Sequence, residues 1–252
     1  VLLVLIGSFG CHPSVSPDED TSPPEPPLRL GYTPSEEIVA DREAAAEALA
    51  GYLERRLQRE VEIVRTASYG PAVEAMRRGE IDIMHLAPFA FVLASDQGIA
   101  EAVAALGRPE SGPRTYQSLI VAHRRTGIAR LEDLHKRAPG LRLNFADPRS
   151  NSGHLVPHAR LRHLGLDPLE DFAACVYTFS HSVAMFNVLF GEADVAGVSR
   201  SNWQRQVEKS RIPPEAFTIL WESPPMPNGP MAVRRWGRRQ GWMPLPFTKT
   251  TV

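Results

Sequence analysis

The sequence of 252 residues contains only two cysteines, Cys11 and Cys175. Neither belongs to a His/Cys spacing typical of zinc sites, and Cys11 lies in a segment that we do not expect to pack, so neither a metal site nor a disulfide framework is expected. No apolar run reaches the roughly 18–20 residues that a membrane-spanning helix requires. The 28 basic and 29 acidic side chains nearly cancel. A nucleic-acid partner is therefore not expected, because binding to a phosphate backbone needs a basic excess.

The first eleven residues have the character of an export signal. An unbroken apolar run, residues 1–6, is followed by Gly7-Ser8-Phe9-Gly10 and then Cys11. We interpret residues 1–11 as a signal-peptide remnant. The small residue before Cys11 resembles a lipoprotein cleavage box, although Ser8 stands where such a box usually has leucine. Cys11 is therefore a candidate site of lipid attachment, and a plain secretory signal with an incidental cysteine is the alternative.

A proline-rich segment follows at residues 12–27. It holds six prolines and no large apolar residue except Val15, so it cannot bury enough surface to fold. We interpret it as a stiff, disordered tether between an anchor and a folded domain. An ordinary disordered terminus is the alternative.

From Leu28 onward, short apolar segments alternate with segments of helical periodicity. Strands are predicted at 28–32, 61–65, 81–87, 118–122, 141–145, 173–178 and 194–198. Helices are predicted at 45–57, 72–78, 89–95, 131–136, 152–164 and 182–190. This alternation predicts an α/β fold in which a mostly parallel sheet is covered by helices. We find no internal sequence repeat.

The pattern restarts near residue 118, which predicts two lobes. We place lobe 1 at residues 28–121 and 225–252 and lobe 2 at residues 122–224. The chain would cross between the lobes near 120–124 and again near 219–225. In folds of this class a ligand binds at the carboxyl ends of strands and between lobes.

One segment combines residue types that suit an anion. The predicted strand ending at Phe145 is followed by a turn rich in hydroxyl groups and by a helix that begins near Ser152. A helix N-terminus exposes unpaired N–H groups and the positive end of the helix dipole, which favour an anion. Ser150 and Ser152 add hydroxyl donors, and Gly153 lets an oxyanion approach the backbone. Helix capping is the alternative, because serine favours that position anyway.

The run Asp147-Pro148-x-Ser150-x-Ser152-Gly153-x-Leu155-x-Pro157 closely resembles the signature of the phosphate-, phosphite- and phosphonate-binding proteins of ABC transporters. Further blocks agree with that family in order and spacing, at 69–83, 116–121, 127–134, 180–182 and 191–198. The resemblance extends from about Leu28 to Val233. It implies a two-lobed periplasmic binding protein fold, type II-like, in which each lobe is a mostly parallel sheet covered by helices and the lobes close on the ligand.

The resemblance also implies a set of ligand-binding residues. By position they are Tyr69, Ser150, Asn151, Ser152, Gly153 and His181. Family members usually carry threonine where this chain has Asn151, so one hydroxyl donor is lost while the N–H remains. The alternatives are a helix cap for His181 and a core or rim aromatic for Tyr69. Asp194 stands at the start of a predicted strand and is a candidate for either a pocket acid or a hinge residue.

Ser182 follows His181 at a position where some relatives that take aminoalkylphosphonates carry an acid. An ammonium group in a closed cleft without a counter-charge is costly. The resemblance therefore implies a preference for phosphite or methylphosphonate over 2-aminoethylphosphonate, unless Asp194 supplies the acid.

The function expected from these features is that of the solute-binding component of an ABC importer, which captures a phosphorus oxyanion and delivers it to the membrane permease. We expect a monomer in the periplasm or at the cell surface, held to the membrane if Cys11 is lipidated, without a cofactor. The alternatives are a ligand-sensing module of the same fold coupled to a kinase, and a phosphoryl-group hydrolase. The sequence disfavours an enzyme, because it has no carboxylate cluster for a metal, no Gly-x-x-x-x-Gly-Lys-Ser/Thr loop and no Gly-x-Ser-x-Gly elbow.

Overall fold

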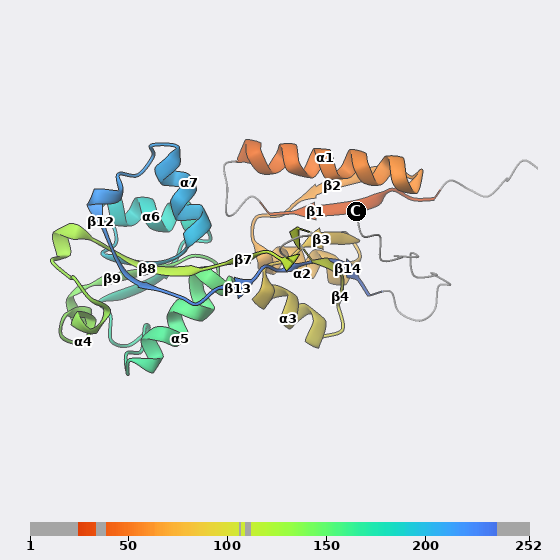
Figure 1. Ribbon diagram of the computed structural model, residues 1–252. Coiled ribbons are helices and arrows are strands. Elements are labelled where there is room, and N and C mark those ends of the chain that lie inside the picture. Colours follow the sequence, from red (N-terminus) through yellow and green to blue (C-terminus); the bar gives the residue numbers. More distant parts are fainter. Residues whose placement is uncertain (1–24, 34–38, 106, 109–111, 236–252) are drawn as a thin grey trace, which may run out of the picture.

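The computed structural model describes residues 25–33, 39–105, 107–108 and 112–235. It has two lobes, each built around one five-stranded sheet, and two chain segments join them (Figure 1). The proposed signal-peptide remnant, Cys11, most of the proline-rich segment and the residues after Arg235 lie outside the described part of the chain.

The first lobe contains helices α1 (Val39–Leu57), α2 (Tyr69–Arg78) and α3 (Pro88–Asp96). Its strands lie in the order β2 (Val61–Arg65), β1 (Leu28–Tyr32), β3 (Ile83–His85), β14 (Pro230–Arg234) and β4 (Ala100–Ala105). Strand β14 is antiparallel to both of its neighbours, so the other four strands share one direction. The predicted mostly parallel sheet is confirmed for this lobe.

The second lobe contains helices α4 (Leu134–Arg137), α5 (Val156–His163), α6 (His181–Phe190) and α7 (Arg200–Glu208). Its strands lie in the order β10 (Ala174–Tyr177), β9 (Arg142–Phe145), β11 (Val195–Ser199), β8 (Ser118–His123) and β12 (Phe217–Glu222). Strand β8 is the one antiparallel strand of this sheet. The helix predicted from Ser152 begins instead as a π-helical turn over Asn151–Leu155 and continues as α5.

Several short elements complete the described chain. They are a two-stranded pair β5 (Gly107–Arg108) and β6 (Gly112–Pro113), and 3-10 turns at Arg124–Thr126, Leu131–Asp133, Ala138–Gly140 and Pro214–Ala216. None of the described helices combines the length and the apolar character that crossing a bilayer requires.

The two lobes are joined by a short antiparallel ribbon of β7 (Thr115–Tyr116) and β13 (Met226–Pro227). The first crossing therefore lies before β8 and not near residues 120–124, where the sequence analysis placed it. Strand β8 belongs to the second sheet, because Leu119 and Val121 enter one buried cluster of that lobe and Ile120 and Ala122 enter the other. A strand that is buried on both faces reads as a continuous apolar run, so its pattern does not show to which lobe it belongs.

The two lobes repeat one arrangement of strands and helices, which the sequence analysis missed. Both sheets have the same order, with one inserted antiparallel strand in the same place. Helices α2 and α6 occupy equivalent positions, and each follows a serine and ends at a glycine in the left-handed conformation, Gly79 and Gly191. The segments Ser68-Tyr69 and Ser180-His181 are therefore equivalent helix starts, and the two lobes present them in corresponding places.

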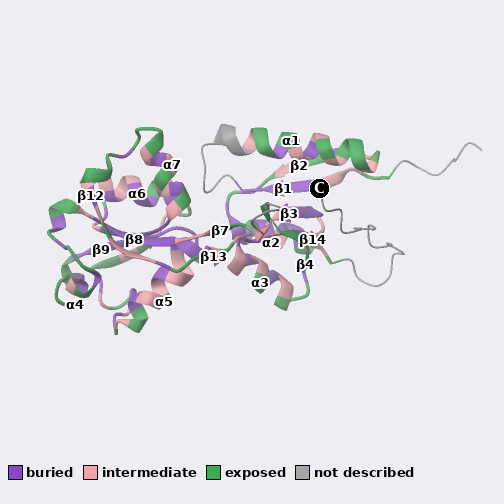
Figure 2. Cartoon of the chain, viewed as in Figure 1, coloured by how far each residue is buried: buried purple, intermediate pink, exposed green. Residues whose placement is uncertain are grey.

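Each lobe has its own hydrophobic core, and Figure 2 shows the buried residues concentrated along the two sheets and the helix faces against them. In the first lobe, Met76 of α2 and Ala90 of α3 pack in one cluster with Met84 of β3. In the second lobe, Leu143 and Phe145 of β9 lie in one such cluster. Independent cores allow the lobes to behave as separate rigid bodies about the connecting ribbon.

Candidate functional site

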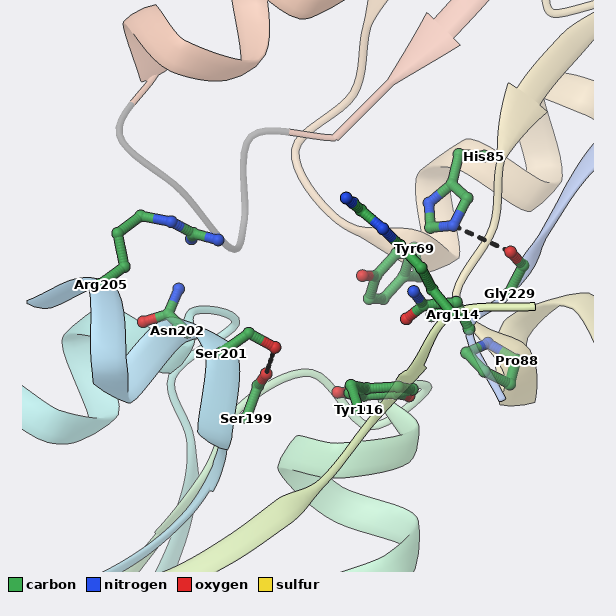
Figure 3. Close-up of a pocket in the computed structure, with 13 residues that line it drawn as sticks. Tyr69, His85, Pro88, Arg114, Tyr116, Ser199, Ser201, Asn202, Arg205 and Gly229 are labelled. Carbon is green, nitrogen blue, oxygen red and sulfur yellow. Dashed lines mark hydrogen bonds between the residues drawn. The ribbon is translucent and has the colours of Figure 1, made fainter. Parts of the chain in front are cut away.

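A cavity of about 240 Å³ lies where the two lobes and the connecting ribbon meet (Figure 3). It is lined by Tyr69, His85, Ala87, Pro88, Arg114, Tyr116, Ser150, Ser199, Ser201, Asn202, Arg205, Asn228 and Gly229. These residues include the ends of β3 and β11 and the turns that follow them. The cavity therefore lies at the carboxyl ends of strands from both sheets, the place expected for a ligand in such folds.

Several helix N-termini converge on this cavity. Tyr69 is the first residue of α2, Pro88 is the first residue of α3, and Ser199 precedes α7. Ser150 precedes the turn that leads into α5. Each helix start carries a partial positive charge, so together they favour an anion in the space between them.

The turn after β9, residues 146–152, is called the serine turn below. Ser150 is 1% exposed, and its hydroxyl oxygen accepts a hydrogen bond from the Gly153 N–H at 3.0 Å. The N–H groups of Asn151 and Ser152 belong to the first turn of the helix and have no intrahelical acceptor. The serine turn thus combines the capping role of Ser150 with two further donors for an anion.

His181 lies beside the serine turn at the start of α6 and is 1% exposed. Its Nδ1 accepts a hydrogen bond from the Ser199 N–H at 3.1 Å, and its Nε2 lies 3.5 Å from the Ser150 hydroxyl oxygen. A backbone N–H can only donate, so Nδ1 is the unprotonated nitrogen and the neutral ring carries its hydrogen on Nε2. His181 therefore presents an N–H donor to the Ser150 side of the cavity.

Gly153 allows this approach of His181 to the serine turn. A Cβ atom at position 153 would lie 2.5 Å from His181 Cε1 and 2.5 Å from Ala146 Cβ. Both distances are far below ordinary carbon–carbon contact. The sequence analysis predicted that Gly153 lets an anion approach the backbone. In the structure, the His181 ring lies in the space that a side chain at position 153 would take.

Asn151 and Ser152 are not among the residues that line the cavity. The Asn151 side-chain amide donates to the Tyr116 hydroxyl at 3.2 Å and to the Met226 sulfur at 3.3 Å, so it ties the serine turn to the connecting ribbon. Ser152 is buried, and its carbonyl oxygen accepts from the Ser118 hydroxyl at 2.6 Å. Of the predicted ligand residues, the structure places Tyr69 and Ser150 in the cavity wall and His181 directly behind Ser150.

Asp194 lies away from the cavity, at the opposite end of β11. It accepts hydrogen bonds from the Arg142 N–H at 2.9 Å and from the Arg142 and Arg125 guanidinium groups. Burial alone would raise the pKa of Asp194, but the hydrogen bonds from Arg142 and Arg125 hold it below its usual value. With strands rising about 3.3 Å per residue, the five residues of β11 place Asp194 on the order of 15 Å from the cavity end of the strand.

Asp82 of the first lobe is the equivalent of Asp194, and the two carboxylates make the same kind of contact. Asp82 stands before β3 as Asp194 stands before β11, and it accepts from the Arg29 N–H at 3.0 Å and from the Arg29 guanidinium. Each carboxylate therefore joins two neighbouring strands of its own sheet. The structure excludes Asp194 from the cavity and from the connecting ribbon, which are the two roles that the sequence analysis weighed.

Asp147 makes a contact between the lobes that the sequence analysis did not select. Its carboxylate accepts from the Tyr69 N–H of the first lobe at 3.1 Å and from the Arg149 N–H at 2.7 Å. The side chain of Arg149 lies against Gly70, where a Cβ atom would come within 2.6 Å of a guanidinium nitrogen. The serine turn of the second lobe thus supplies the capping carboxylate for helix α2 of the first.

The sequence analysis also missed the polar residues that the ribbon and α7 bring to the cavity. These are Arg114, Tyr116, Ser199, Ser201, Asn202, Arg205 and Asn228. The Asn228 N–H donates to the Arg114 carbonyl oxygen at 3.0 Å, which fixes the two crossing segments to each other at the cavity. Within the described residues, no group of His, Cys, Asp and Glu side chains is placed to hold a metal ion.

Known proteins share this architecture. A curated relative, the phosphate-import protein PhnD of Mycolicibacterium smegmatis, is 27% identical over 234 residues, which is 87% of this chain and 70% of the relative. The crystal structure of a binding component of an ABC phosphonate transporter from Pseudomonas aeruginosa matches with 25% identity and a TM-score of 0.69, over 82% of this chain and 68% of that one. PhnD1 of Prochlorococcus marinus in complex with methylphosphonate matches with 19% identity and a TM-score of 0.71, over 82% of this chain and 76% of that one.

These matches confirm the two-lobed periplasmic binding fold expected from the sequence. The family model described as the periplasmic phosphonate substrate-binding protein of ABC transporters covers residues 30–236, which is well over half of the chain. The chain therefore belongs to the family of periplasmic substrate-binding proteins of phosphonate ABC transporters and is the solute-binding component of such a system.

Proposed function

We propose that this protein captures a phosphorus oxyanion at the serine turn, in the cavity between the lobes, and delivers it to a membrane permease as a monomer. The observation that carries the proposal is the arrangement of Ser150 in the cavity wall with the N–H groups of its turn beside it and His181 Nε2 at 3.5 Å. The name of the Mycolicibacterium relative, which specifies phosphate, and the methylphosphonate bound to the Prochlorococcus protein support this ligand class.

The donors in this arrangement suit an ionised oxyanion. Hydroxyl groups, backbone N–H groups and an imidazole N–H all donate to oxygen, and hydrogen bonds to a charged acceptor are roughly twice as strong as neutral ones. Tyr69 brings a hydroxyl-bearing ring from the first lobe to the same cavity (Figure 3). A ligand held by both lobes would favour the arrangement in which they touch.

A hydrolase is the less favoured function, although Ser150 and His181 form a serine–histidine pair. A nucleophilic serine needs a histidine nitrogen that can accept its proton. Here the Ser199 N–H occupies Nδ1, so Nε2 carries hydrogen and cannot act as the base. We therefore propose that the pair binds oxygen and does not activate a nucleophile.

Replacing Ser150 with alanine is expected to weaken methylphosphonate binding by roughly 10-fold to 150-fold, which corresponds to the loss of a hydrogen bond to a charged group worth about 1.5–3 kcal/mol. Titration calorimetry measures this change. The matched control is Ser180→Ala, because Ser180 also caps a helix, by accepting from the Val183 N–H, but does not line the cavity. Both variants should lose about 1 kcal/mol of stability as cap losses. If Ser150→Ala and Ser180→Ala bind methylphosphonate with equal affinity, Ser150 only caps its helix and does not bind the ligand.

The family implies a periplasmic or cell-surface location, and we also propose that Cys11 carries a lipid. The motivation is the sequence Ser8-Phe9-Gly10-Cys11 after an apolar run. Full-length protein made in a bacterium is expected to partition into detergent, whereas a Cys11→Ser variant should remain in the aqueous phase. Identical partitioning of the two proteins would refute the anchor.

A further inference from the structure

The cavity lining carries positive charge in addition to the donors of the serine turn. Arg114 reaches it from the connecting ribbon and Arg205 reaches it from α7, and Figure 3 shows their side chains extending from different sides of the cavity. Among the described residues that line the cavity there is no aspartate or glutamate. A single oxyanion at the serine turn does not account for the guanidinium group of Arg114, which lines the same cavity.

The cavity is also larger than one oxyanion requires. A water molecule takes about 30 Å³ of liquid, so a volume of about 240 Å³ corresponds to roughly eight waters. A tetrahedral oxyanion of five heavy atoms replaces only a few of them. The lobes already touch through the Asp147–Tyr69 hydrogen bond, so this space is not that of a widely opened cleft.

Arg114 is held in a position that suits recognition. Its backbone carbonyl oxygen is bonded to the Asn228 N–H, so the two crossing segments fix its Cα position beside the cavity. Its side chain is exposed, and a guanidinium group forms paired, parallel hydrogen bonds with a carboxylate or a second phosphoryl group.

We infer that the ligand carries a second anionic group, a carboxylate or another phosphoryl group, which Arg114 binds while the serine turn holds the phosphorus oxyanion. The inference rests on the proposed function and deepens it. It gives the substrate class as phosphonates or phosphate esters with an acidic tail. A ligand with an ammonium tail would meet the like charge of Arg114 instead and bind weakly.

Titration calorimetry with methylphosphonate, phosphonoacetate and 2-aminoethylphosphonate tests the inference. The wild-type protein is expected to bind phosphonoacetate about tenfold or more tighter than methylphosphonate, the gain of one charge-assisted pair, and to bind the amino compound most weakly. Arg114→Gln should lose the preference for phosphonoacetate, so that the ratio of the phosphonoacetate affinity to the methylphosphonate affinity falls to about one. The matched control is Arg211→Gln, an exposed arginine outside the cavity lining, which should keep the wild-type order.

The outcomes separate the two proposals. If methylphosphonate binds and phosphonoacetate binds no tighter, the acidic-tail inference is wrong and the proposed function stands. If Arg114→Gln keeps the full preference, Arg114 is not the contact. If the wild-type protein binds none of the three phosphonates, this inference fails, and the proposed function fails with it if phosphate and phosphite do not bind either.

Discussion

Replacing Gly153 with alanine is expected to reduce methylphosphonate affinity by more than roughly 100-fold, because at least two charge-assisted hydrogen bonds of about 1.5 kcal/mol each are lost. The new Cβ would lie 2.5 Å from both His181 Cε1 and Ala146 Cβ, so either the histidine or the serine turn must move. Either movement separates the His181 N–H from Ser150. The strain should also lower the free energy of unfolding by about 1–3 kcal/mol, the usual cost of overpacking.

Gly140→Ala is the matched control for this substitution. A Cβ atom at Gly140 meets nothing within 4 Å, so stability and affinity should stay close to those of the wild-type protein. Calorimetric titration gives the affinities, and thermal unfolding shows how much of each variant is folded at the titration temperature. If folded Gly153→Ala protein binds methylphosphonate almost normally, His181 and the serine turn do not bind the ligand.

Asp147→Asn is expected to weaken ligand binding by roughly tenfold or more, because a charged acceptor of two N–H groups is worth about 1.5–3 kcal/mol. The carboxylate accepts from Tyr69 in one lobe and from Arg149 in the other. An amide of the same shape has one oxygen acceptor, and its NH₂ group would face an N–H donor. The arrangement in which the lobes touch thus loses stability relative to an opened one, and apparent affinity falls with its population.

Small-angle scattering measures the opening directly. Wild-type protein with methylphosphonate should show a smaller radius of gyration than protein alone, and Asp147→Asn should need more ligand to reach the compact form. Asp133→Asn serves as control, because that carboxylate also accepts two N–H groups, from Ala129 and Arg130, but all within the second lobe. Unchanged affinity and identical scattering in Asp147→Asn would show that this contact does not govern closure.

The sequence predicted the fold class and most of the repeating elements, because apolar periodicity and glycine helix ends carry that information directly. Strand β4 was missed, since its sequence Ala-Glu-Ala-Val-Ala-Ala is poor in residues that favour strands. Helix α7 was missed for a related reason, because Arg200–Glu208 has few apolar residues with which to show a helical period. Strand β4 pairs at the edge of its sheet, and α7 contributes to the cavity lining, so tertiary contacts and not the local sequence pattern identify these two elements.

The site was predicted in part. Ser150 was indicated both by its turn between a strand and a helix and by the family resemblance, whereas Tyr69 was indicated by the resemblance alone. Arg114 and Asn202 come from a crossing segment and from a helix with no apolar period, and only the tertiary structure brings them to the cavity. Asp194 was a candidate for pocket acid because a lone acid before a strand has no local explanation. The equivalent acid Asp82, at the same distance from its helix, provides that explanation.

The central claim is that the cavity between the lobes binds a phosphorus oxyanion, and titration of the wild-type protein tests it most directly. Phosphate, phosphite and methylphosphonate would be compared with methanesulfonate and arginine, since proteins of the same fold are known bound to a sulfonate buffer and to arginine. We expect saturable, one-to-one binding of at least one phosphorus oxyanion and none of methanesulfonate or arginine. Binding of methanesulfonate or arginine with no response to any phosphorus oxyanion would contradict the account.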